Sequence, residues 1–166
     1  FVVTVNVLPS VNAGTDITVC ENTTITLRAS GANSYSCDNG VTNGVSFTPL
    51  ATTTYTVTGT NANGCVNTDQ VTVTVNTLPT VSAGSDAVIC ENDAITLNGS
   101  GAVSYSWNNG VTDAVSFNPA ATTTYTLTGT DANGCTATDQ VIVTVNALPS
   151  VDAGSDVALC TSASVT

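Results

Sequence analysis

The chain has 166 residues, of which 42 % are hydrophobic and only 8 % are charged. It carries a single cation, Arg28, against 12 acidic residues, so its formal net charge is −11. Such a surface repels phosphate backbones and anionic lipid headgroups, which excludes nucleic-acid and membrane-surface partners. Because the chain also lacks histidine and lysine, it lacks the usual acid–base groups of enzymes, and we expect no catalytic activity.

The sequence repeats itself with a period of 70 residues. Leu8-Pro9 recurs as Leu78-Pro79 and as Leu148-Pro149, and about two thirds of the positions are identical when 8–77 is aligned on 78–147 without a gap. A period of this kind is typical of repeat arrays. We therefore expect a window on a longer array, with the last strand of a preceding repeat at 1–7, repeats at 8–77 and 78–147, and the start of a following repeat at 148–166.

Each repeat reads as short strands with no helical period. Apolar and polar residues alternate along 71–75 and 124–128, as on strands with one buried face. Asn-Gly pairs punctuate the runs and favour tight hairpins at 39–40, 63–64, 109–110 and 133–134. In the second repeat we expect strands at 81–89 (kinked at Ala83-Gly84), 94–98, 105–107, 115–117, 123–130 and 140–146. About seven short strands in each repeat predict an antiparallel β-sandwich.

The aromatic residues are expected in the core. Trp107 is the natural anchor between the two sheets, and its counterpart Cys37 fills less space, which predicts a looser core in the first repeat. Phe117 followed by Tyr125 resembles a corner of fibronectin-like sandwiches, in which the tyrosine packs inward and its hydroxyl binds nearby backbone. We assign the same core roles to Phe47 and Tyr55.

Several ordered motifs carry a resemblance to a known repeat type. They are Asp86-Ala-Val-Ile-Cys90, Ala94-Ile-Thr-Leu-Asn98, Tyr105-Ser-Trp107, Thr122-Thr-Thr-Tyr125, Asp131-Ala-Asn-Gly-Cys135 and Val141-Ile-Val-Thr-Val145. Together they resemble the PKD/Ig-like tandem repeats of giant secreted surface proteins of Bacteroidota, which include gliding-motility adhesins and extracellular filaments. The resemblance covers the whole chain and implies an all-β fold of tandem Ig-like (PKD- or fibronectin-like) antiparallel β-sandwiches arranged end to end. Cys37 departs from it, because tryptophan is expected there.

The recurring cysteines indicate disulfides in an oxidising compartment, since no Cys-x-x-Cys pair or histidine offers a zinc site. In an Ig-type topology the turn with Cys20 and the loop with Cys65 lie at opposite poles, about 20 Å apart, whereas a disulfide tolerates a Cα separation of only about 7 Å. In a stacked array the turn instead faces the equivalent loop of the next repeat. We therefore prefer an interdomain Cys20–Cys135 bond, with Cys65, Cys90 and Cys160 pairing outside this chain; the alternatives are intradomain bonds Cys20–Cys65 and Cys90–Cys135, or free thiols, as expected for Cys37.

Calcium is the competing interpretation of the acidic residues. Asp16, Asp86 and Asp156 recur in one motif, and Asp69 and Asp139 recur before the last strand. Calcium needs six to eight oxygens, usually from several converging carboxylates. We prefer structural roles, in which Asp86 binds backbone at the kink of 81–89 and Asp69 and Asp139 cap a loop. On this reading the chain needs no cofactor.

Taken together, these features predict a structural segment of a bacterial cell-surface adhesin or extracellular filament, acting as a stiff extended stalk. Its partners would be the neighbouring repeats of the same array, with other copies of the filament as a second class. One alternative is a subunit of a self-assembling or laterally bundling fibre, because a threonine-rich surface with few charges leaves strand edges unprotected. A further alternative is a carbohydrate-binding module, which would need exposed aromatics on one face. No surface ligand follows from the sequence.

Overall fold

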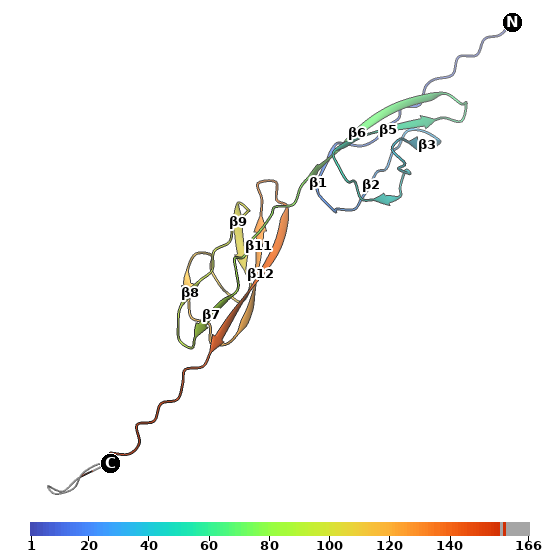
Figure 1. Cartoon of the computed structure of the whole chain (residues 1–166). Helices are drawn as coiled ribbons and strands as arrows, with labels where there is room; N and C mark the ends of the chain where they lie inside the picture. The colour runs from blue at the N-terminus through green and yellow to red at the C-terminus, as the bar shows by residue number, and fades with distance from the viewer. Residues whose placement is uncertain (157, 159–166) are drawn as a thin grey trace.

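The computed structural model describes residues 1–156 and 158, and it contains two β-sandwiches arranged end to end in an elongated molecule (Figure 1). The first sandwich comprises β1 (Ile17–Cys20), β2 (Ile25–Thr26), β3 (Ser34–Cys37), β4 (Ser46–Phe47), β5 (Thr53–Thr60) and β6 (Val66–Asn76). The second repeats this order with β7 (Ala87–Cys90), β8 (Ile95–Thr96), β9 (Ser104–Trp107), β10 (Ser116–Phe117), β11 (Thr123–Thr130) and β12 (Thr136–Asn146). None of the described residues belongs to a helix that could span a membrane.

Strand order identifies both sandwiches as Ig-like. In the first, one sheet has the order β1-β6-β5-β3 and faces the two-stranded sheet β2-β4; the second has β7-β12-β11-β9 and β8-β10. The long hairpins β5–β6 and β11–β12 are antiparallel, whereas β1 runs parallel to β6 and β7 runs parallel to β12. The predicted fold class, tandem all-β Ig-like sandwiches, is therefore confirmed.

The first strand of each sandwich changes sheets at a glycine. Asn12 pairs through an isolated bridge with Ser30, which follows β2 of the smaller sheet, and four residues after Ala13 the chain joins β6 as β1. Gly14 makes this crossing with a φ of 97°, which is open to glycine but rarely adopted by other residues. The predicted kink at Ala83-Gly84 is confirmed, with Gly84 at a φ of 85°. Each sandwich has six strands, not seven, because only a single bridge remains before the kink.

Only two of the four Asn-Gly pairs that were predicted to form hairpins do so. Asn63-Gly64 and Asn133-Gly134 connect the paired strands β5–β6 and β11–β12. The pairs 39–40 and 109–110 also turn the chain with positive φ at both residues, but they follow β3 and β9 and lead to the opposite sheet. The hairpin prediction was wrong there, because a local turn signal does not specify which sheet the next strand joins.

The aromatic residues meet in the two cores. Tyr125 is 5 % exposed, and its ring meets that of Phe117 edge to face with centroids 5.3 Å apart. Tyr55 and Phe47 repeat this contact at 5.3 Å. The expected bond from these tyrosine hydroxyls to backbone is absent among the described hydrogen bonds. Other tyrosines make it: the Tyr105 hydroxyl donates to the Ala102 carbonyl oxygen at 2.7 Å and accepts from the Ala102 N–H at 2.9 Å, and Tyr35 binds Ala32 in the same way.

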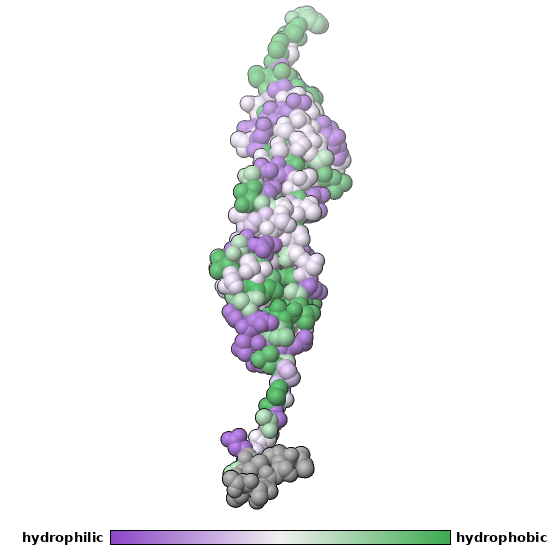
Figure 2. Space-filling view, turned by 60° about the vertical axis from the view of Figure 1, so that its left-hand side comes forward, coloured by the Kyte–Doolittle hydropathy of each residue, from purple (hydrophilic) through white to green (hydrophobic). Residues whose placement is uncertain are grey.

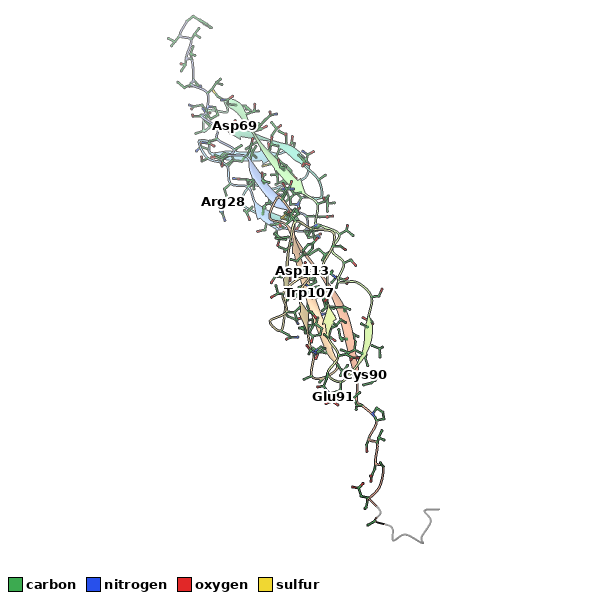
Figure 3. The ribbon with its side chains drawn as sticks, turned by 90° about the vertical axis from the view of Figure 1, so that its left-hand side faces the viewer. Arg28, Asp69, Cys90, Glu91, Trp107 and Asp113 are labelled. Atoms are coloured by element: carbon green, nitrogen blue, oxygen red, sulfur yellow. A yellow bond between two sulfur atoms is a disulfide. The ribbon has the colours of Figure 1, made fainter. Side chains whose placement is uncertain are left out.

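The two cores differ by a set of matched substitutions around Trp107. The Trp107 Nε1–H donates to Asp113 Oδ1 at 2.8 Å, and the same oxygen accepts the Gly99 N–H at 2.7 Å (Figure 3). A Cβ on Gly99 would lie 2.6 Å from the Tyr105 ring and 3.0 Å from Leu127. At these positions the first sandwich has Cys37 for the tryptophan, Asn43 for the aspartate, Ala29 for the glycine and Val57 for the leucine. Asn43 accepts only the Ala29 N–H, at 2.7 Å, so the acceptor has lost its charge together with its second donor.

Four aspartates join the first strand of each sandwich to the last. Asp139 Oδ2 accepts the Ala83 N–H at the kink, and Asp86 Oδ1 accepts the Ile142 N–H of β12, both at 2.8 Å. Asp69 and Asp16 make the equivalent bonds, to the N–H groups of Ala13 and Thr72. This corrects the expected roles, since Asp86 serves the last strand while Asp139 serves the kink. Asp86 was expected at the kink and Asp139 was expected to cap a loop. The observed bonds are reasonable because the chain between Gly84 and β7 leaves the ladder, so backbone donors on both sides of the gap need side-chain acceptors.

These bonds lower the pKa of two of the carboxylates. The Ala83 and Gln140 backbone N–H groups lower the pKa of Asp139 below its ordinary value of 3.8. Those of Ala13 and Gln70 lower the pKa of Asp69 in the same way. Both carboxylates therefore stay ionised to a lower pH than an ordinary aspartate, and an anionic acceptor makes the stronger hydrogen bond.

The matched substitutions predict energetic coupling between Trp107 and Gly99. Trp107→Ala should lower the free energy of unfolding by about 3–5 kcal/mol, the usual cost of truncating a buried tryptophan. Gly99→Ala should destabilise the natural chain through its clash with Tyr105, but should cost less in the Trp107→Ala background, with a coupling of about 0.5–3 kcal/mol. Urea unfolding followed by circular dichroism measures all four variants. Strictly additive effects would show that the substitutions are independent.

Acidification should weaken the sandwiches through Asp69 and Asp139. Because each pKa is lower in the folded chain, each carboxylate stabilises the fold fully above about pH 4, and this contribution is lost as the pH falls through the folded-state value. We expect the free energy of unfolding from urea titrations to fall on the acid side, and to fall less steeply in Asp139→Asn. Asp152→Asn, outside both sandwiches, is the control. An Asp139→Asn profile parallel to that of the natural chain would contradict this account.

Candidate functional site: the disulfide junction

Cys20 is placed at the pole of the first sandwich from which the chain leaves. It ends β1, and its register partner is Asn76, the last residue of β6. The Glu21 N–H donates to the Asn76 carbonyl oxygen at 2.7 Å, and the Thr23 N–H donates back to the Cys20 carbonyl oxygen at 3.1 Å. Cys20 is therefore fixed beside the peptide that leads into the second sandwich.

Cys135 is held in a short loop at the facing pole of the second sandwich. The loop joins β11 to β12, and Asp131 organises it from within: Oδ1 accepts the N–H groups of Asn133 and Cys135, both at 2.8 Å. Backbone bonds between Asp131 and Cys135 and between Gly134 and Asp131 close the turn. The Asp131-Ala-Asn-Gly segment is thus a hairpin loop whose carboxylate binds backbone, as Asn61 does in the first sandwich at 2.9 and 3.0 Å.

The structure joins Cys20 to Cys135 by a disulfide across the junction. Their Cα atoms are 5.6 Å apart, although the residues are separated by 115 positions in the sequence. This is the interdomain pairing preferred from the pole argument. The intradomain alternative is not formed, since Cys65 and Cys90 are free thiols here. Each sandwich places its own two cysteines at opposite poles, because one ends the first strand and the other immediately precedes the last strand, which runs parallel to the first.

Burial shows which groups the junction covers. Cys135 is 1 % exposed, whereas the equivalent Cys65 is only half-buried. Leu78, in the connecting peptide, is half-buried, whereas Leu8 and Leu148 at the same place in the repeat are 60 % and 54 % exposed. Leu78 was named from the sequence only as a landmark of the repeat, and its place in the junction was not predicted. The sequence did contain a signal for it, since a leucine recurs at this place between the strands of successive repeats, outside either sandwich core.

The outer poles carry the same groups without a partner sandwich. Cys90 ends β7 and is exposed, and the Glu91 N–H donates to the Asn146 carbonyl oxygen at 2.8 Å, as Glu21 does at the junction. Figure 3 shows Cys90 and Glu91 where the chain leaves the second sandwich. At the other end, the Cys65 N–H donates to Asn61 Oδ1 at 2.9 Å. Cys160, also expected to pair outside the chain, lies outside the described residues.

Cys37 takes no part in the junction. It lies on β3, half-buried against the first core, as a free thiol. Burial raises its pKa, and the neighbouring Asp38 carboxylate adds to that shift. A thiol with a raised pKa has little thiolate at neutral pH and is a poor nucleophile.

The acidic residues proposed as calcium ligands do not converge. Four of them each accept a backbone N–H between the first and last strands of a sandwich, namely Asp16, Asp69, Asp86 and Asp139. Asp156 is exposed beyond the second sandwich. The described part of the chain contains no group of three His, Cys, Asp or Glu residues able to hold a metal ion. It also has no pocket. The junction is accordingly the feature with the most specific chemistry.

The surface between the poles is polar and mixed. Figure 2 shows small hydrophobic groups of residues interrupted by hydrophilic ones along the rod. Trp107, Tyr55 and Tyr125 are buried, and the other aromatics of the two sandwiches are at least half-buried. The exposed aromatic face that a carbohydrate-binding module would need is therefore not formed by the described sandwiches.

Comparison with known proteins found similar solved structures but no similar sequence. No protein-family model and no curated protein sequence matches the chain. Among solved structures, the insect immune protein hemolin is similar over 84 % of this chain with 17 % identity and a TM-score of 0.43, and the chain spans about half, 46 %, of hemolin. Titin A168169 and DIP-gamma IG1+IG2 match 80 % and 83 % of this chain and 95 % and 97 % of theirs, with identities of 15 % and 9 % and TM-scores of 0.32 and 0.33. Similarity this low concerns the fold alone.

Proposed function

We propose that this chain is a structural segment of a long extracellular array of Ig-like repeats, which acts as a stiff stalk in a bacterial surface adhesin or filament. The observation that carries the proposal is the Cys20–Cys135 disulfide, which joins two sandwiches that the peptide already connects. This second covalent connection runs between the sandwiches and closes no loop within either of them. It restricts bending and rotation of one sandwich against the other.

The end-to-end arrangement supports the same role. Two sandwiches of identical strand order stand in line, with their chain ends at opposite tips (Figure 1). The repeat limits are proposed as 8–77 and 78–147, with 1–7 and 148–166 belonging to neighbouring repeats. Disulfides persist in oxidising compartments, which agrees with an extracellular location.

The exposed poles are proposed as docking sites for those neighbouring repeats. Cys90 and Glu91 reproduce the arrangement of Cys20 and Glu21 at the junction, and the loop with Cys65 reproduces the loop with Cys135. We infer that Cys90 pairs with the loop cysteine of the following repeat, and Cys65 with the turn cysteine of the preceding one. Cys160 would continue the series.

Stiffness of the junction tests the proposed function. We expect the oxidised chain to show a narrow distribution of angles between the two sandwiches in negative-stain images and an extended small-angle scattering profile. The double variant Cys20→Ser/Cys135→Ser should broaden that distribution, because only the peptide near Leu78 then connects the sandwiches. Cys37→Ser is the matched control and should leave it unchanged. Equal flexibility with and without the disulfide would contradict a stalk, and growth of the particles with concentration would favour a self-assembling fibre.

Pairing of Cys90 is a separate prediction. In the present chain Cys90 should react readily with iodoacetamide, and Cys37 slowly, because it is half-buried with a raised pKa. When the chain is extended by one complete further repeat, Cys90 should become protected and appear in a disulfide with the loop cysteine of that repeat in non-reducing peptide maps. A Cys90 that stays alkylatable in the longer chain would show that the junction is not repeated.

A further inference from the structure

The peptide and the disulfide leave the first sandwich at adjacent positions but enter the second at different strands. The peptide follows β6 and leads into the strand that becomes β7. The disulfide starts at the end of β1 and arrives at Cys135, immediately before β12. The shortest covalent route through the chain is therefore β1, the disulfide and β12. Residues 21–134 lie outside this route.

Without the disulfide, tension would act directly on the pairing of the first and last strands. Force would enter the first sandwich through β1 and leave through β6, which run parallel. Pulling on the front of one strand and the rear of its parallel neighbour shears their four-residue ladder and the bonds of Asp16 and Asp69 all at once. When these contacts fail, the tension passes to the remaining ladders and the core of the sandwich.

We propose that the junction disulfides carry tension past the body of each sandwich, so that the stalk bears load without unfolding. The proposal rests on the proposed function. In the oxidised chain, force that enters β1 leaves it at Cys20 and continues along β12, so both strands are pulled along their own length. The strands between them, from β2 to β11, lie off the loaded route and serve to hold β1 and β12 in place.

In an array with the proposed pairing of Cys65 and Cys90, this arrangement produces two covalent routes. One follows β6, the connecting peptide and β7 from Cys65 to Cys90, and then crosses to the next repeat. The other crosses from Cys20 to Cys135 and follows β12. Each sandwich then contributes its first strand to one route and its last strand to the other, and the parallel ladders β1–β6 and β7–β12 hold the two routes together.

Single-molecule stretching of this chain between its two ends tests the proposal. The variant Cys37→Ser/Cys65→Ser/Cys90→Ser/Cys160→Ser keeps only the junction disulfide. Held at a force that unfolds the reduced chain, it should stay short until a thiol reductant is added, and should then lengthen by roughly 400 Å, because the 115-residue separation is released at about 3.3–3.6 Å per residue. The same variant with Cys20→Ser is the matched control and should unfold fully without reductant.

Two results would overturn the proposal. Oxidised and Cys20→Ser chains that lengthen equally would show that the disulfide carries no load. In the chain with all its cysteines, two separate reductant-dependent releases of about 160 Å each would indicate loops of about 45 residues, as intradomain bonds would close. The proposed function fails on different evidence, since a stiff oxidised rod that nevertheless unfolds under force contradicts only the load route. A flexible oxidised rod contradicts the stalk whatever the stretching shows.

Discussion

The parallel pairing of the first strand of each sandwich with its last is the constraint on which the junction depends. Because β1 runs alongside β6 in the same direction, Cys20 reaches the pole from which the chain departs. Because β11 and β12 form an antiparallel hairpin, Cys135 lies at the opposite pole of its own sandwich. Two cysteines at opposite poles cannot meet within a sandwich, whereas end-to-end stacking brings Cys20 and Cys135 to a Cα separation of 5.6 Å. Strand direction alone therefore turns a pair of cysteines in each repeat into a connection between repeats.

The disulfide also connects two sandwiches whose hydrophobic cores differ in buried apolar volume. The first sandwich has Cys37 and Val57 where the second has Trp107 and Leu127, so it buries less apolar volume. A cross-link that closes a loop of 115 positions restricts the unfolded chain, by about 5 kcal/mol in the chain-entropy treatment. The loop includes most of both sandwiches, so this stabilisation is shared between them. A repeat with a smaller core can then persist in an array in which an isolated copy would be marginal.

The sequence allowed the architecture and the junction to be predicted, but not several local contacts. Alternation along 124–128 and the glycine kink at 84 depend on short-range rules, and both are present as expected. The partners of Asp86 and Asp139 were predicted wrongly, because the chain between the kink and β7 leaves donors unpaired on two strands, which only the three-dimensional gap reveals. The hydrogen bond from a tyrosine hydroxyl to backbone is made by Tyr105 and not by Tyr125, since Tyr105 lies three residues from Ala102, whose carbonyl oxygen it binds. Sequence identifies which side chains go inside, but the position of each polar tip depends on the neighbouring strand.

The spacing of the cysteines gives the proposed array a redundancy that neither intradomain bonds nor a single staple would give. The disulfide spans 115 positions while the sequence repeats every 70, so each closed loop overlaps the next along the chain. If one junction disulfide is reduced, the route through β6 and β7 remains continuous and takes the whole load. The disulfides of two adjacent junctions must both be reduced before the sandwich between them becomes part of the only covalent connection between the two ends of the array. Disulfides confined to one repeat would leave the connecting peptide as the sole covalent link at every junction. Failure of any one of these peptides would then break the whole stalk.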